Sequence, residues 1–194
     1  MMNTLKPALL LFSLLSLITG IGYPLLTTLI GKTFFPHQSA GSLIIQKESI
    51  IGSELIGQSF ASPRYFWGRL SATTPMPYNA QASSGSNLSA TNPALGDAAK
   101  ARVEELNKHS PKTSATLQQI PVDLITASAS GLDPEISPEA AYYQIERIAH
   151  IRHISEANLR RLIADHTNNR QWGLLGEPRV NVLKLNLALD ALEH

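Results

Sequence analysis

The feature that most constrains this chain is a run of 25 residues, from Pro7 to Gly31, without a single charged side chain. Lys6 and Lys32 lie at its two ends. As a helix rising 1.5 Å per residue, the run is ~37 Å long, enough to cross a hydrocarbon core of ~30 Å with some tilt. Its second half contains glycine and proline, which bilayer helices tolerate better than soluble ones. The sequence therefore predicts a transmembrane anchor helix over residues 7–31.

A cleaved signal peptide and a buried core helix are the competing interpretations. The apolar part of a signal peptide is about 7–15 residues long and precedes a small-residue cleavage site. The run here is longer, and only Ser39-Ala40-Gly41 follows it as such a site. A core helix facing solvent on one side would show a polar face, and none occurs between Pro7 and Ile30. The pattern favours a retained anchor.

The charges around the run leave its orientation weakly determined. Lys6 and the α-amino group lie on one side, and Lys32 and Lys47 lie on the other, so the positive-inside bias is nearly balanced. The short N-terminal segment favours a cytoplasmic N-terminus and a C-terminal part outside the membrane. The absence of cysteine is compatible with an oxidising exterior without requiring one.

The remaining residues, 32–194, carry 15 Lys and Arg and 15 Asp and Glu, because Lys6 is the only charged side chain before them. An electroneutral segment argues against a nucleic-acid surface or a polybasic lipid-binding patch as its main function. Its length suits one soluble domain with its own core. We therefore expect a single domain behind the anchor.

Residues 62–92 have the composition of a long loop, rich in Pro, Ser, Thr and Asn. The loop also contains several aromatic and arginine side chains, although solvated linkers are poor in aromatics. These side chains are Arg64, Tyr65, Phe66, Trp67, Arg69 and Tyr78. Because a loop of this length within a compact domain is uncommon and often functional, we expect it to pack against another surface.

Three helices are predicted by capping signals. Asn92-Pro93 opens a helix to about Lys108, and Ser137-Pro138 opens one to about Ile151. Ser155 begins a third, with apolar residues at helical spacing after it.

The segment 180–192 fits both an alternating strand and a helix face; a short strand through 180–182 followed by a helix capped at Asn181 is favoured. Further strands are predicted at 42–47, 55–58 and 122–126. The predicted fold class is α+β.

Neither a metal site nor a catalytic centre is supported by motif spacing. The chain has no cysteine and no HExxH motif, so its histidines are interpreted as surface or core-edge residues. Serine, histidine and aspartate residues could form a hydrolytic triad, but the sequence has no Gly-x-Ser-x-Gly elbow to support one. The residues concerned are His150, His153 and His166 for a metal, and Ser128, Ser130 and Asp133 with His166 for a triad.

Ordered motifs across about 150 of the 194 residues resemble the C subunit of the Kdp-type potassium-transporting P-type ATPase. Each motif alone is weak, but their order and spacing after one N-terminal span make the similarity specific. The main stretches are 64–69 (RYFWGR), 83–88 (SSGSNL), 121–128 (PVDLITAS), 131–134 (GLDP), 136–141 (ISPEAA) with Gln144, and 175–190 (LGEPRVNVLKLNLALD). The chain departs from the family pattern at Leu70, Ser89-Ala90, Ala129 and Glu135.

This resemblance implies a non-catalytic accessory subunit of a high-affinity, ATP-driven potassium pump in the bacterial inner membrane. The implied partners are a channel-like potassium-binding subunit, an ATP-hydrolysing P-type subunit, a small single-span subunit and membrane lipid. No cofactor is expected to bind this chain tightly; ATP and K⁺ act at the level of the complex. The family's domain lies in the periplasm.

The resemblance also implies a chaperone-like role that raises the affinity of the catalytic subunit for ATP, with Gln144 as the residue connected with it. A periplasmic Gln144 could not touch cytoplasmic ATP through ~30 Å of hydrocarbon, so a stabilising and gating role is favoured. Partner-interface candidates are Gly20, Gly22, Arg64, Tyr65, Phe66, Trp67, Arg69, Tyr78 and Asn87. An independent periplasmic hydrolase and a nucleotide-binding module remain the alternatives.

Overall fold

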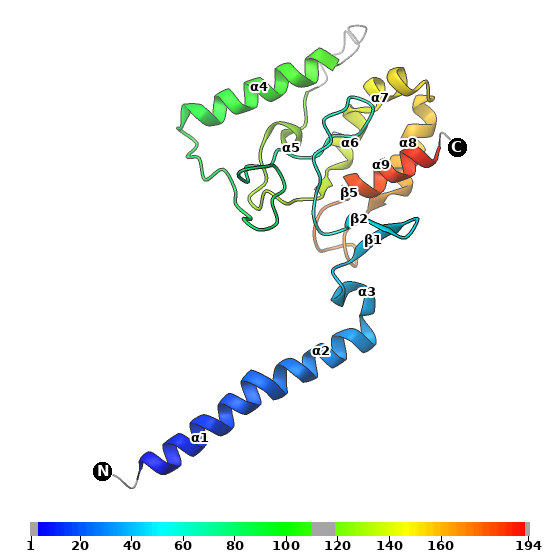
Figure 1. Ribbon diagram of the computed structural model, residues 1–194. Coiled ribbons are helices and arrows are strands. Elements are labelled where there is room, and N and C mark those ends of the chain that lie inside the picture. The colour runs from blue at the N-terminus through cyan, green and yellow to red at the C-terminus, as the bar shows by residue number, and fades with distance from the viewer. Residues whose placement is uncertain (1–3, 110–118, 193–194) are drawn as a thin grey trace. The chain divides into compact units, whose positions relative to one another are not determined.

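The structure is a computed structural model that describes residues 4–109 and 119–192 (Figure 1). The chain divides into two compact units, one ending at Ser53 and the other beginning at Glu54, and each is described by itself. The first contains the apolar helix and a hairpin. The second is a mixed helix and sheet domain. The predicted α+β class is confirmed.

The first unit begins with a continuous helix from Leu5 to Phe34, long and apolar enough to cross a membrane. It consists of α1 (Leu5–Leu17), a π-helical turn η1 (Ile18–Gly22) and α2 (Tyr23–Phe34). The wide turn directly precedes α2, whose second residue, Pro24, lacks the N–H that a regular helix would need there. Hydroxyl groups along the helix bond to its own carbonyls, for example Thr19 Oγ1 to Leu15 O at 2.8 Å. Such internal pairing suits an apolar surrounding.

A short helix, α3 (Pro36–Ser39), leads into the antiparallel strands β1 (Leu43–Gln46) and β2 (Ser49–Ser53). Lys47 and Glu48 join these strands with φ of 48° and 65°, the backbone of a two-residue hairpin turn. The strand predicted at 42–47 is thus confirmed as β1. The strand predicted at 55–58 is wrong, because the hairpin turn places the second strand earlier, at Ser49–Ser53.

In the second unit, the long helix α4 (Pro93–His109) begins as predicted after Asn92, whose Oδ1 accepts a hydrogen bond from Ala94 N at 3.0 Å. Residues 122–126 do not form the predicted strand. They contain the helical turn α5 (Val122–Ile125). A short apolar run fits either type of element, and here the preceding Pro121 and the acidic Asp123 in the first turn favour the helical one.

The remaining elements surround one hydrophobic core. They are β3 (Glu135–Ile136), α6 (Pro138–Tyr143), α7 (Ile145–Arg152), α8 (Glu156–Asp165), β4 (Thr167–Asn168), β5 (Arg179–Asn181) and α9 (Val182–Ala191). The strands form a small antiparallel sheet in the order β3-β5-β4. In Figure 1, α6 to α9 lie together, and β5 leads directly into α9.

Side-chain caps begin three of these helices where the sequence predicts them. Ser137 accepts a hydrogen bond from Ala140 N, Ser155 from Asn158 N, and Asn181 from Lys184 N. The predicted strand followed by a helix over 180–192 is confirmed. The helix predicted from Ser137 to about Ile151 is instead broken at Gln144 into α6 and α7.

Candidate functional site

Gln144 lies in the core at the break between α6 and α7. There it meets residues 62–78, the first part of the predicted loop 62–92, which are called the loop from here on. Only 1% of Gln144 is exposed. Its Oε1 accepts hydrogen bonds from Trp67 N at 2.8 Å and from Arg147 Nη2 at 2.6 Å. Its Nε2 donates to Trp67 O and to Ala140 O, both at 3.1 Å. Both donor hydrogens and both acceptor positions of the amide are therefore used within the fold.

A second buried amide holds the neighbouring residue in the same manner. Asn186, on α9, accepts a hydrogen bond from Phe66 N at 2.9 Å and donates one to Phe66 O at 3.0 Å. The N–H and C=O groups of two consecutive loop residues thus bond to side-chain amides instead of a neighbouring strand. This satisfies backbone groups that would otherwise be buried without a partner.

Two arginines lie against the ring of Trp67. The guanidinium carbon of Arg147 is 4.2 Å from the centre of its ring, and that of Arg102 is 4.9 Å away. The ring of His109 packs edge-on against the Trp67 ring, with the two ring centres 5.6 Å apart. Trp67 Nε1 donates a hydrogen bond to Ser62 O at 2.9 Å. Cations above an aromatic face are attracted by its quadrupole. Burial, and secondarily repulsion from Arg102, lowers the pKa of Arg147 to about 10.

Tyr65 connects the loop to α7 and α9. Its ring lies 4.7 Å from the guanidinium carbon of Arg152, and its hydroxyl donates to Asp190 Oδ2 at 3.2 Å. Arg152 also pairs with Asp190 Oδ1 at 2.8 Å and donates to Arg64 O at 2.7 Å. Arg147 donates to the carbonyls of Pro63 and Tyr65. Arginines from α7 thus fix the backbone that precedes Phe66.

Tyr78 closes the far end of this loop. Its hydroxyl donates to Arg69 O at 2.6 Å, and burial, followed by the nearby Asp133 carboxylate, raises the pKa of Tyr78. The close approach requires glycine at position 68, because a Cβ there would lie 2.9 Å from the tyrosine oxygen. A cavity of about 120 Å³ lies beside Tyr78, Trp67 and Arg102, which is below the ~300–1,000 Å³ usual for small-molecule sites.

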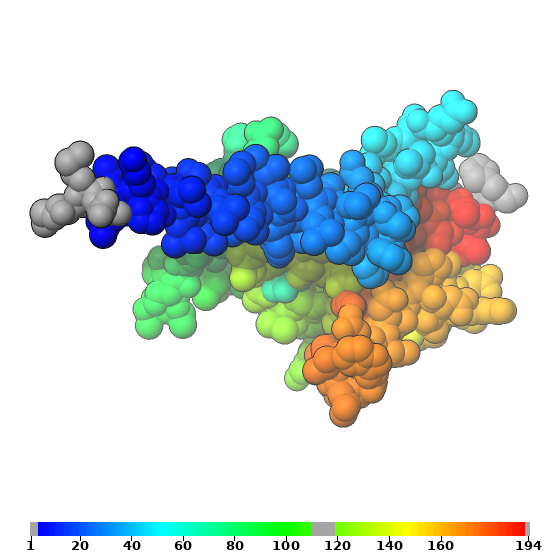
Figure 2. All heavy atoms as spheres, turned by 90° about the horizontal axis from the view of Figure 1, so that it is seen from below, coloured from blue at the N-terminus to red at the C-terminus, as the bar shows by residue number. Residues whose placement is uncertain are grey.

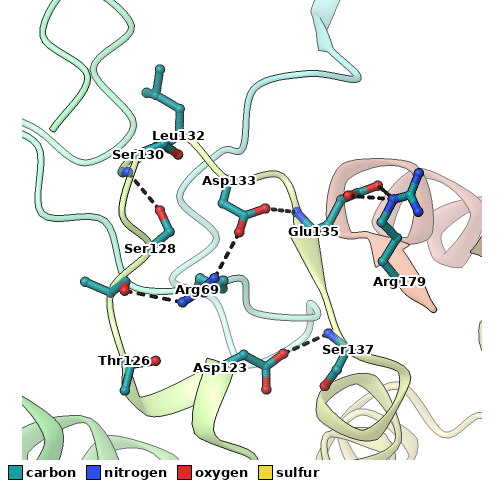
Figure 3. A network of polar contacts seen from close by, with 12 residues as sticks. Arg69, Asp123, Thr126, Ser128, Ser130, Leu132, Asp133, Glu135, Ser137 and Arg179 are labelled. Carbon is teal, nitrogen blue, oxygen red and sulfur yellow. Dashed lines mark hydrogen bonds and ion pairs between the residues drawn. The ribbon is translucent and has the colours of Figure 1, made fainter. Parts of the chain in front are cut away.

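A polar network connects the loop to β3 and β5 (Figure 3). Arg69 Nη1 pairs with Asp133 Oδ2 at 3.1 Å, and Asp133 Oδ1 accepts from Glu135 N at 3.0 Å. Glu135 in turn pairs with Arg179 at 2.9 Å. Burial raises the pKa of Glu135, partly offset by Arg179. The charges of this network balance one another within the domain.

The predicted interface residues separate into two groups. Phe66 is 0% exposed and Trp67 1% exposed, so these two candidates pack into the domain's own core and do not lie on its surface. Asn186 and the arginines of α4 and α7 bind them into the core instead. Arg64 and Asn87 are exposed, and Tyr65, Arg69 and Tyr78 are half-buried. Gly20 and Gly22 lie in the exposed π-helical turn of the apolar helix.

Four residues that hold the loop were not predicted as site residues: Asn186, Arg102, Arg147 and Arg152. A signal existed for Asn186, because it is a polar residue at helical spacing among Val182 and Leu189, both buried. The arginines gave no such signal, since arginine is usually exposed on a helix surface.

The imagined triad does not form. Ser128 Oγ accepts from Gly131 N, Ser130 Oγ accepts from Leu132 N, and Asp133 pairs with Arg69. His166 Nδ1 bonds to Leu162 O within its own helix end. Among residues 4–109 and 119–192, no three His, Asp or Glu side chains lie close enough together to hold a metal ion.

A long apolar helix and an α+β domain whose buried polar groups serve its own fold fit a single-pass membrane protein. The model of the family "K+-transporting ATPase, c chain" matches residues 5–191. The potassium-transporting ATPase KdpC subunit of Variovorax paradoxus (strain S110) is 56% identical over 191 residues, covering 98% of this chain and 97% of that protein. That of Burkholderia mallei (strain SAVP1) is 55% identical over 193 residues, covering 100% and 98%. The chain therefore belongs to the KdpC family, the accessory subunit of the K⁺-transporting ATPase.

Proposed function

We propose that the domain from Glu54 onward lies in the periplasm, with the N-terminus in the cytoplasm, and stabilises the assembled pump without binding nucleotide. Its partners are a channel-like potassium-binding subunit, an ATP-hydrolysing P-type subunit and a small single-span subunit in the bacterial inner membrane. ATP and K⁺ act on the complex, and this subunit modulates their coupling by shifting a conformational equilibrium.

The environment of Gln144 carries this proposal. A side chain that binds ATP must offer a polar atom to it, whereas the amide of Gln144 already makes four hydrogen bonds within the core. Freeing the amide would leave buried backbone groups of Trp67 unpaired, at a cost of about 1–3 kcal/mol each. The role of Gln144 is therefore to hold the loop, and substitutions there act on the pump through the fold of this domain.

Membrane topology is the first test. Ser86 is exposed, and the chain has no cysteine, so Ser86→Cys provides one reactive position in the domain. Thr4→Cys is the matched control on the other side of the apolar helix. In cells whose outer membrane has been made permeable, a membrane-impermeant thiol reagent should label Ser86→Cys and spare Thr4→Cys. The reverse pattern would place the domain in the cytoplasm and restore the nucleotide-binding alternative.

Nucleotide binding is the second test. The purified full-length chain in detergent should show no saturable binding of a fluorescent ATP analogue, and Gln144→Ala should not change that result. Saturable binding that is lost in Gln144→Ala, while the variant stays folded by circular dichroism, would contradict the proposal. Hydrolysis of a substrate by the purified chain alone would instead support the independent hydrolase.

A further inference from the structure

The connection between β4 and β5 carries an exposed apolar tip, residues 170–177. Trp172 is 88% exposed and Leu174 81%, the largest exposed fractions among the large apolar side chains of the described residues. Leu175 beside them is also exposed. Figure 2 shows the orange segment that contains these residues projecting outward. Single exposed apolar residues are common on protein surfaces, but a cluster led by tryptophan indicates an interaction site.

The tip has a defined shape. Gln171 N donates to Leu175 O at 2.8 Å, and Leu175 N donates to Gln171 O at 3.0 Å. At its base, Arg170 pairs with Glu177 at 2.6 Å. Trp172 itself has a φ of 53°, a left-handed conformation that a bulky residue rarely adopts. The chain therefore holds an exposed tryptophan in a costly backbone conformation, which a functional contact would explain.

We propose that Trp172 and Leu174 insert into an apolar pocket on a partner subunit of the K⁺-transporting ATPase. The inference rests on the proposed function, in which this chain acts inside the assembled complex. Tryptophan is enriched among the residues that dominate the binding energy of protein interfaces. A tip whose backbone is already fixed loses little conformational entropy on docking, which favours binding.

A protein partner suits this tip better than the lipid surface. Arg170 is neutralised by Glu177, and the next arginine, Arg179, is paired with Glu135. The tip thus presents no surplus positive charge to anionic headgroups, whose attraction for basic residues drives such contacts. A fixed backbone also serves a pocket of fixed shape, whereas fluid lipid adapts to any apolar side chain.

Binding of variants to the partner subunits tests the inference. The purified partner subunits in detergent are titrated with the full-length chain, its Trp172→Ala and Leu174→Ala variants, and Val122→Ala as a control. Val122 is an exposed apolar residue on α5, outside both the loop and the tip. Truncating an anchoring tryptophan should weaken binding about tenfold or more, whereas the control should bind as the wild type does.

The outcomes separate the tip from the proposed function. If the wild-type chain does not bind the partner subunits, the proposed function itself fails. If it binds and Trp172→Ala binds equally well, only the tip inference fails.

Fluorescence identifies the competing occupant. Of the two tryptophans, Trp67 is buried, so quenching reports mainly on Trp172, and Trp172→Phe supplies the blank. In vesicles without partner subunits, brominated acyl chains should leave Trp172 emission unchanged. Strong quenching there would show that the tip inserts into lipid and would overturn the inference.

Discussion

Two irregular segments of the domain each contain one tryptophan: the loop of residues 62–78 and the tip of residues 170–177. The two tryptophans differ in exposure, because Trp67 is buried and Trp172 is exposed. Trp67 is held by a glutamine, two arginines and a histidine and is removed from solvent. Trp172 is displayed to solvent on a short turn. Irregular backbone and aromatic composition therefore do not identify a docking surface. Burial decides, and burial depends on residues far away in sequence.

The largest effect should come from Trp67→Ala. Removing a fully buried tryptophan leaves a cavity and takes away the aromatic ring that Arg102 and Arg147 contact, so the free energy of unfolding should fall by about 3–5 kcal/mol. Urea denaturation of the full-length chain in mild detergent, followed by circular dichroism, measures the change. A loss below about 1 kcal/mol would show that the loop is not part of the core.

Gln144→Ala should rank second. The variant leaves the N–H and C=O of Trp67 buried without their partners, and we expect a loss of about 2–4 kcal/mol in the free energy of unfolding. Asn186→Ala is the matched comparison, because it frees the corresponding groups of Phe66. Denaturation curves of both variants check the result. Wild-type stability in Gln144→Ala, combined with a loss of pump activity, would contradict a structural role for this residue.

A smaller, pH-dependent effect should come from Glu135→Gln. Burial raises the pKa of Glu135 in the folded state, so the folded protein holds this proton more tightly than the unfolded chain does. Its contribution is therefore present below the unfolded pKa of about 4.5 and lost as the pH rises through the folded pKa.

The stability difference between wild type and Glu135→Gln measures this effect. It should shift in favour of the variant as the pH rises from 4 to 7. A difference independent of pH would show that Arg179 fully compensates the burial of the carboxylate.

Trp172→Ala should have the smallest effect on folding. Its side chain contributes little to the core, so the free energy of unfolding should change by no more than about 0.5 kcal/mol. Thermal unfolding measures the stability of Trp172→Ala and of Trp67→Ala, and so compares the same substitution in the tip and in the loop. A strongly destabilised Trp172→Ala would remove the contrast between the loop and the tip, and would show that the tip packs against its own chain.

The features that depend only on neighbouring residues could be predicted from the sequence. The uncharged run from Pro7 to Gly31 is sufficient to predict a long apolar helix, because an uncharged, mainly apolar run of this length matches the thickness of a hydrocarbon core. Asn92, Ser137, Ser155 and Asn181 cap helices, since a capping side chain bonds to backbone groups two or three residues away. The motif order was likewise enough to indicate the family, which the matching relatives confirm.

The position of the aromatic loop depends on contacts between residues that are far apart in the sequence. Asn186 contacts Phe66 across 120 positions of sequence, and Gln144 contacts Trp67 across 77, so no local pattern reveals either pairing. The same holds for the break between α6 and α7. There Gln144 lies between the two helices and its side chain bonds to the backbone of Trp67 in the loop. At 122–126, an apolar run too short to show a period became a helical turn. The helix caps and the apolar helix depend on residues close together in the sequence. Burial of the loop depends on side chains from α4, α7 and α9 that only the folded domain brings to it.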